Sequence, residues 1–160
     1  MMKKLKHLKI FLLLMLTFLA SCAQNEFGSV RLVINGQEQE VRIRDVDCIN
    51  DFNFGNNGMS CIILIQNGSG ISDTVRFNIA DVVNIYDNFL GANLDPLLSP
   101  FDSVEATVNG NTVGILAGSI VVFSSITNVP GGQVCVDYFK LNLGFGTNGF
   151  MEGDFCARVQ

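Results

Sequence analysis

The chain has no tryptophan and, among its 160 residues, a single histidine, His7. His7 lies in a lysine-rich N-terminal segment that is typical of an export signal and is removed from the mature protein. The mature chain would then have no histidine, which excludes Ser-His-Asp and Cys-His catalysis and metal sites with imidazole ligands. Without tryptophan there is no large aromatic platform for a sugar, so Asp102 and Glu105 are interpreted as surface charges rather than a glycosidase pair. We predict that the protein is not an enzyme.

Basic residues are also scarce. The chain has 10 Lys and Arg against 15 Asp and Glu, and four of the lysines lie within the first nine residues. Without the N-terminal segment, six basic and 15 acidic residues remain, a balance of −9. Nucleic acids and anionic lipid surfaces repel a domain of this charge, so we expect no nucleic-acid partner.

The N-terminal segment has the parts of a bacterial export signal. Four lysines precede an apolar run from Ile10 to Leu19, which is too short to span a bilayer comfortably. Leu19-Ala20-Ser21-Cys22 resembles the lipobox of bacterial lipoproteins, whose signal is cut before the cysteine. The resemblance implies a signal peptide over residues 1–21, acyl chains such as palmitate on Cys22, and a lipid-anchored tether over residues 22–29. Two or more acyl chains hold a protein on a membrane, whereas one chain gives marginal binding.

Residues 30–160 are predicted to form a single β domain. Short apolar runs alternate with Gly and Asn, and two Asn-Gly pairs, Asn35-Gly36 and Asn109-Gly110, are strong hairpin signals. We expect an all-β fold, an antiparallel β-sandwich or barrel of about 7–9 strands with one short helix. The hairpins predict the pairs Val30–Val41, Arg31–Glu40, Val104–Ile115, Ala106–Val113 and Thr107–Thr112, and further strands are expected over residues 61–66, 74–79, 119–126, 133–143 and 150–159.

The expected helix covers residues 81–91. Asp81 can cap its start and Gly91 can end it, while Val82, Tyr86, Phe89 and Leu90 share the side expected to face the core. An apolar loop follows, in which Pro96 and Pro100 exclude a helix. Its apolar side chains either close an open end of the sheets or form a surface for a ligand or partner; they are Leu94, Leu97, Leu98 and Phe101.

Four cysteines remain after Cys22, an even number that implies disulfides in an exported chain. They are Cys48, Cys61, Cys135 and Cys156. Three connectivities are open, and proximity in the sequence favours Cys48 with Cys61 and Cys135 with Cys156.

Residues 45–61, which include the first two of these cysteines, are rich in Asp and Asn. Asp45, Asp47, Asp51 and Asn53 offer the oxygen ligands that calcium prefers, although their spacing departs from the EF-hand pattern. Asp, Asn and Gly are also the residues that tight irregular loops require. We predict a disulfide-closed loop without a cofactor, with calcium binding as the alternative.

The lipobox, the early Asn-Gly hairpin and a final strand containing Gly149, Gly153 and Phe155 together resemble small β-rich lipoproteins of the Bacteroidota. The resemblance implies an envelope component of unknown role, anchored in the outer membrane. It also implies O-glycosylation of Thr74 and Ser103, because Asp73-Thr74-Val75 and Asp102-Ser103-Val104 resemble the acceptor triplet of that phylum.

Two functions are consistent with these features. The first is a non-enzymatic lipoprotein of the envelope, a structural or accessory subunit that binds another protein. The second is a carrier or sensor of a small apolar ligand, with residues 82–101 at the mouth of a cavity.

Overall fold

The structure is a computed structural model that describes residues 27–51, 53, 56–144 and 148–160. The predicted signal peptide and the lipidation of Cys22 lie outside the described residues. Within the described ranges, no helix has the length and apolar character needed to cross a bilayer.

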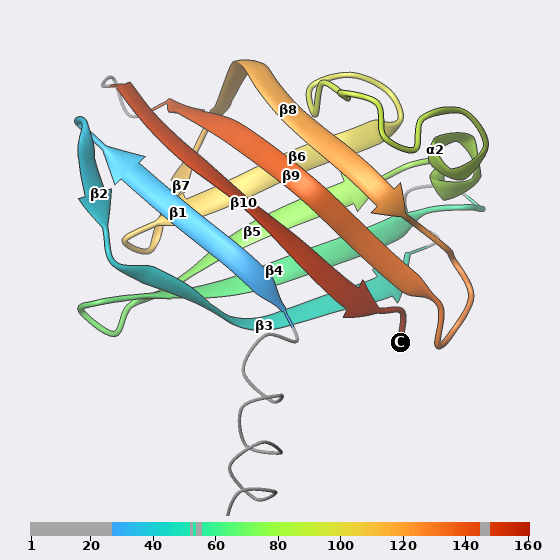
Figure 1. The fold of residues 1–160 in the computed structure, drawn as a ribbon, viewed down its shortest axis with the longest axis horizontal. Coiled ribbons are helices and arrows are strands. Elements are labelled where there is room, and N and C mark those ends of the chain that lie inside the picture. The colour runs from blue at the N-terminus through green and yellow to red at the C-terminus, as the bar shows by residue number, and fades with distance from the viewer. Residues whose placement is uncertain (1–26, 52, 54–55, 145–147) are drawn as a thin grey trace, which may run out of the picture.

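The described chain forms a β-sandwich of two five-stranded antiparallel sheets, as Figure 1 shows. The predicted all-β class is therefore confirmed. Sheet A has the strand order β2-β1-β10-β9-β8, and sheet B has the order β3-β4-β5-β6-β7. The elements are β1 (Gly28–Ile34), β2 (Gln37–Gln39), β3 (Val41–Asn50), β4 (Met59–Asn67), β5 (Ser72–Ile79), α2 (Val82–Asn88), β6 (Phe101–Val108), β7 (Asn111–Val113), β8 (Ile115–Ser125), β9 (Gln133–Gly144) and β10 (Asn148–Arg158).

The two halves of the chain have the same topology. Each of the strands β1–β5 has a counterpart five strands later in the chain, at the same position of the other sheet. The order β2-β1-β10-β9-β8 of sheet A therefore corresponds to the order β7-β6-β5-β4-β3 of sheet B. In each half an Asn-Gly hairpin comes first, and the chain then crosses to the other sheet, at Glu40 and again at Gly114. The sandwich is thus built from two intertwined halves, and only the segment between them, residues 80–100, has no counterpart of similar length.

Both Asn-Gly hairpins form in the predicted register. Leu32 pairs with Gln39 in the first hairpin, and Ala106 pairs with Val113 in the second. The first turn residues, Asn35 and Asn109, have φ of 55° and 53°, and the glycines that follow each have φ of 75°. Asn and Gly tolerate this left-handed backbone better than other residues, which explains why the pair determines the turn.

The hairpins are shorter than predicted, because each returning strand leaves for the other sheet after three residues. The predicted pairs Val30–Val41, Arg31–Glu40 and Val104–Ile115 are therefore wrong. A turn determines the local register but carries no signal for the point at which a strand changes sheet. The observed partners are Gly153 for Val30, Glu152 for Arg31, Phe77 for Val104 and Leu143 for Ile115.

The core lies between the two sheets and is filled mainly by phenylalanine and aliphatic side chains. The predicted inward residues of β5, Val75, Phe77 and Ile79, are completely buried. Phe77 and Phe155 come from the central strands of the two sheets, and their ring centroids are 5.8 Å apart in a stacked arrangement. Full burial of one such side chain stabilises the fold by roughly 1.5–3 kcal/mol.

The long edge strands are covered by other parts of the chain. Val159 forms a bridge with Cys48 on β3, and Leu94 forms one with Val121 on β8. The remaining edge strands, β2 and β7, have three residues each. These bridges and the short length of β2 and β7 reduce the free backbone that the edges offer to another strand.

Candidate functional site

Both predicted disulfides form. Cys48 of β3 is bonded to Cys61 of β4, and Cys135 of β9 is bonded to Cys156 of β10. Each joins directly opposed residues of neighbouring strands, with Cα atoms 4.1 Å and 4.2 Å apart. The register shifts between Gly153 and Phe155, and beyond this irregularity the hairpin continues to the pair Asn148–Gly144; residues 145–147 lie outside the described residues.

The two disulfides lie at the same end of the sandwich but on different faces of their sheets. The Cys48–Cys61 sulfurs belong to side chains that are 0% and 1% exposed in the core. Cys156 lies between the buried Phe155 and Ala157, so strand alternation places its side chain on the outer face of sheet A. One disulfide is therefore part of the core, and the other fastens the surface.

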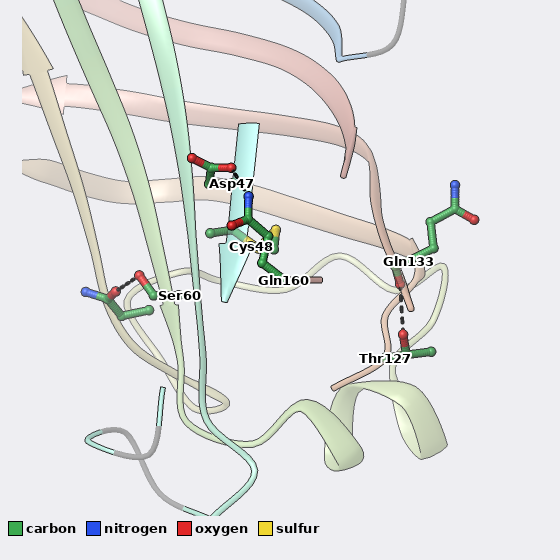
Figure 2. The surroundings of a disulfide bond; sticks show 8 residues. Asp47, Cys48, Ser60, Thr127, Gln133 and Gln160 are labelled. Atoms are coloured by element: carbon green, nitrogen blue, oxygen red, sulfur yellow. Dashed lines mark hydrogen bonds between the residues drawn. A yellow bond between two sulfur atoms is a disulfide. The ribbon is translucent and has the colours of Figure 1, made fainter. Parts of the chain in front are cut away.

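The Cys48–Cys61 disulfide also holds the C-terminal residue. The backbone N–H of Gln160 donates to the carbonyl of Cys48 at 2.9 Å, and the Gln160 side chain donates to the carboxylate of Asp47. Figure 2 shows Gln160 beside Asp47 and Cys48. The end of the chain is thus attached to the edge of sheet B.

The predicted calcium ligands take part in separate hydrogen bonds. Asp47 accepts from Gln160, Asp45 accepts from the N–H of Val46, and Asp51 accepts from the backbone and side-chain nitrogens of Asn53. In the described ranges, no group of three or more His, Cys, Asp or Glu side chains is placed to hold a metal ion. Asp45 and Asp47 lie in β3 and Asp51 follows it, each with its own hydrogen-bond partner, and calcium binding stays a prediction.

The predicted helix forms as α2, with its N-terminus capped as expected. The Asp81 carboxylate accepts a hydrogen bond from the N–H of Asn84 at 3.1 Å. The core side of the helix is, however, predicted wrongly. Val82 and Ile85 are buried, whereas Tyr86 is 56% exposed and Leu90 is 41% exposed. Because α2 has only seven residues, it packs on the sheets through Val82 and Ile85, which are three residues apart. Tyr86 lies on the neighbouring side of the helix and points outward.

Two of the four apolar side chains of the loop close the core, and the other two are exposed. Leu94 and Phe101 are buried in the core, whereas Leu97 and Leu98 are 48% and 62% exposed. Asp95 creates the difference, because its carboxylate accepts from the N–H of Leu97 and its carbonyl accepts from the N–H of Leu98. These bonds form a tight turn whose tip carries the two leucines.

We define the apolar end by five exposed side chains, Val83, Tyr86, Leu90, Leu97 and Leu98. They come from α2 and the loop after it, which lie together at one end of the sandwich in Figure 1. The described residues include ten large apolar side chains that are strongly exposed, and half of them belong to this one segment. A concentration of this kind is characteristic of an interaction surface, whereas single exposed apolar residues are ordinary.

All the charged residues in the stretch of sequence around α2 and the apolar loop are acidic. Residues 77–139 contain no Lys, Arg or His and six acidic residues. Asp81 and Asp95 are occupied by the caps already described, while Asp87 and Asp102 are exposed. The stretch of sequence that contains the apolar end therefore carries acidic groups alone.

A second candidate is a hollow of about 990 Å³ on the outer face of sheet A. Val33, Leu116, Leu143 and Phe150 give it apolar walls, and Lys140 is its basic group, with Nζ 4.8 Å from the Phe150 ring centroid. One wall is a break in the β8 ladder, where Ser119 donates to the carbonyl of Leu116 and accepts from the N–H of Asn142. The hollow is open to solvent and is separate from the mouth predicted at residues 82–101.

Charged groups next to this hollow are paired with one another. Arg31 forms ion pairs with Glu38 at 3.0 Å and Glu152 at 2.8 Å. Burial raises the pKa of Tyr138, and the charge and hydrogen bonding of Glu152 raise it further. Glu152 thus stabilises neighbouring groups, which agrees with a structural role for this carboxylate.

The two predicted glycosylation sites lie in strands of sheet B. The Thr74 hydroxyl is 3.3 Å from the Thr107 hydroxyl, and Ser103 accepts a hydrogen bond from the side chain of Asn78 at 2.9 Å. Asp73, the acid of the first triplet, is only 1% exposed and accepts from the N–H of Gly110. Both hydroxyls are half-buried, and their modification stays a prediction.

Sequence reasoning missed Val83 at the apolar end and the residues of the hollow on sheet A. Val83 follows a buried valine in the same short helix, so only the packing direction of the helix reveals its exposure. The hollow depends on strands that are distant in the sequence.

Comparisons with protein-family models, with curated proteins and with solved structures find no match.

Proposed function

We propose that this protein is a non-enzymatic, lipid-anchored subunit of a bacterial cell envelope that binds another protein through its apolar end. The observation that carries the proposal is the exposure of Val83, Tyr86, Leu90, Leu97 and Leu98 within the one segment that links the two halves. The segment contributes Val82, Ile85 and Leu94 to the core, whereas its five exposed side chains are available for a role other than folding.

The location is supported by two independent features. The Leu19–Cys22 sequence resembles a lipobox, which would attach the chain to a membrane through Cys22. The two disulfides require an oxidising compartment, because thiols stay reduced in the cytosol of most organisms. Both features favour the envelope, with the outer membrane as the proposed site.

The carrier alternative has less support at the place where the sequence suggested it. The sequence suggested a cavity mouth formed by residues 82–101, and four apolar side chains of that segment, Val82, Ile85, Leu94 and Phe101, are buried as part of the core. The side chains that could have lined an opening thus fill it. The exposed residues of the same segment point to solvent, which favours a surface for a macromolecule.

The proposal can be tested by purifying tagged, full-length protein after crosslinking in its native cells. The expected result is a near-stoichiometric protein partner that is lost with Cys22→Ala, together with an acyl mass on the wild-type cysteine. If the purified protein instead carries a defined small molecule and no protein, the carrier function replaces the one proposed.

A further inference from the structure

We infer that the partner docks on the apolar end through a segment in which Lys or Arg side chains flank apolar ones. This inference rests on the proposed function and adds the chemistry of the partner. Two observations support it: the exposed apolar side chains of the apolar end, and the negative charge of the segment that contains them.

The apolar contact requires apolar side chains on the partner. Leu97 and Leu98 lie next to each other in a turn, and they are 48% and 62% exposed. Val83 and Tyr86 are three residues apart on one side of α2, and Leu90 follows just after the end of the helix, so the three extend the surface. Tyr86 has an apolar ring and a polar tip, a combination that is common in binding surfaces.

The charge requires basic side chains around that contact. Asp87 lies on α2 between Tyr86 and Leu90, and Asp102 lies at the start of β6, directly after the apolar loop. The two ion pairs found in the described residues both belong to Arg31, on sheet A, so neither pair involves these aspartates. No basic residue occurs between Arg76 and Lys140 to neutralise them from nearby in the chain. A basic segment would complement this surface and would be attracted to it over roughly the 8–10 Å Debye length of physiological salt.

The same charges disfavour the two other occupants of an apolar surface. Anionic lipid headgroups would be repelled by Asp87 and Asp102, whereas surfaces that lie on membranes usually carry Lys and Arg. A second copy of the chain would bring identical acidic groups together across the contact, which opposes self-association. A basic partner segment satisfies both the apolar and the electrostatic requirement.

The probe is a synthetic amphipathic helix of leucine and lysine, and its reference is the same peptide with glutamate in place of every lysine. Binding to full-length protein in a neutral detergent is measured by fluorescence anisotropy at low and at high salt. We expect binding of the lysine peptide alone, and a weaker affinity at high salt. Leu97→Ser with Leu98→Ser should weaken binding about tenfold or more, the size typical of removing a central contact.

Matched variants separate the surface from general effects of charge and hydrophobicity. Ile71→Ser removes a side chain that is 42% exposed outside the apolar end, and it should leave the affinity unchanged. Asp87→Lys should weaken binding of the lysine peptide, while Glu40→Lys makes the same change in net charge at an exposed position on the opposite end and should have a much smaller effect. Circular dichroism of each variant verifies that it is folded.

Three results would overturn the inference. They are equal binding of the two peptides, equal effects of Asp87→Lys and Glu40→Lys, and binding to anionic vesicles or dimer formation that requires Leu97 and Leu98. A native partner that is retained at high salt and with Asp87→Lys would overturn the inference but leave the proposed function standing. The absence of any anchor-dependent partner in cells would overturn the proposed function, even if the lysine peptide binds.

Discussion

The two ends of the sandwich are closed in different ways. One end, which we call the turn end, contains the tight turns at Asn35-Gly36, Asn67–Ile71 and Asn109-Gly110. Two of these turns are joined by a hydrogen bond from the Asn67 side chain to that of Asn109, at 3.1 Å. The apolar end has the longer connections, over residues 51–58, 80–100 and 126–132, and both disulfides lie close to it.

The connections at the two ends are determined by different features. At the turn end, the backbone preferences of Asn and Gly determine the connections. At the apolar end, the disulfides hold the strands that flank residues 51–58 and 126–132, whereas residues 80–100 connect β5 and β6, which carry neither disulfide. Val83, Leu97 and Leu98 are exposed in that segment, where we propose that a partner binds.

The largest expected effect is the loss of the buried disulfide. Cys48→Ala with Cys61→Ala should destabilise the protein by about 3 kcal/mol from chain entropy alone, with a further loss from the space left in the core. Cys135→Ala with Cys156→Ala opens a loop of similar length, with 21 residues of separation against 13, but Cys156 is only half-buried. Urea unfolding should therefore rank the first double variant as less stable, and the reverse order would contradict the role assigned to burial.

A smaller effect is expected from strain at the turn end. Gly110→Ala places a Cβ at φ of 75°, where a left-handed backbone costs roughly 1–2 kcal/mol for a residue with a side chain. Gly68→Ala is the matched control in a neighbouring turn, because its φ is not left-handed and its Cβ would meet no atom closer than 3.8 Å. Thermal unfolding should show a lower midpoint for Gly110→Ala alone. Equal midpoints would mean that the turn does not restrict the fold.

The turn end could be predicted from the sequence to a greater extent than the apolar end. Asn109-Gly110 specifies a turn through local backbone chemistry, and the pairing of Ala106 with Val113 follows from it. The crossing at Glu40 depends on pairing with strands more than 100 residues away, and the exposure of Tyr86 depends on how α2 sits on the sheets. Neither is encoded in a local pattern, whereas the proximity of the cysteines was enough to favour the correct disulfides.

The apolar end should be nearly neutral for stability. Leu97→Ser with Leu98→Ser removes side chains that are already about half exposed, so the free energy of unfolding should change by less than about 0.5 kcal/mol per substitution. Leu94→Ser, three residues before Leu97, removes a core side chain and should be far more harmful. Denaturant titration of the two variants compares the two roles directly. A large loss with the exposed pair would assign those leucines to the fold.

The smallest effect is expected from calcium. Asp45, Asp47 and Asp51 already accept hydrogen bonds from separate donors, so millimolar calcium should leave the unfolding midpoint unchanged. A ligand that binds the native state raises the midpoint as its concentration exceeds its dissociation constant. A rise that Asp47→Asn removes would show that the loop beside the buried disulfide binds the metal.

The most direct measurement is a purification from native cells, after crosslinking, of three full-length proteins: the wild type, Leu97→Ser with Leu98→Ser, and Ile71→Ser. We predict that the wild type and Ile71→Ser retain the same near-stoichiometric protein, and that the double leucine variant loses it while still folded and membrane-bound. If the double variant retains that protein at the wild-type level, the apolar end is not the binding surface.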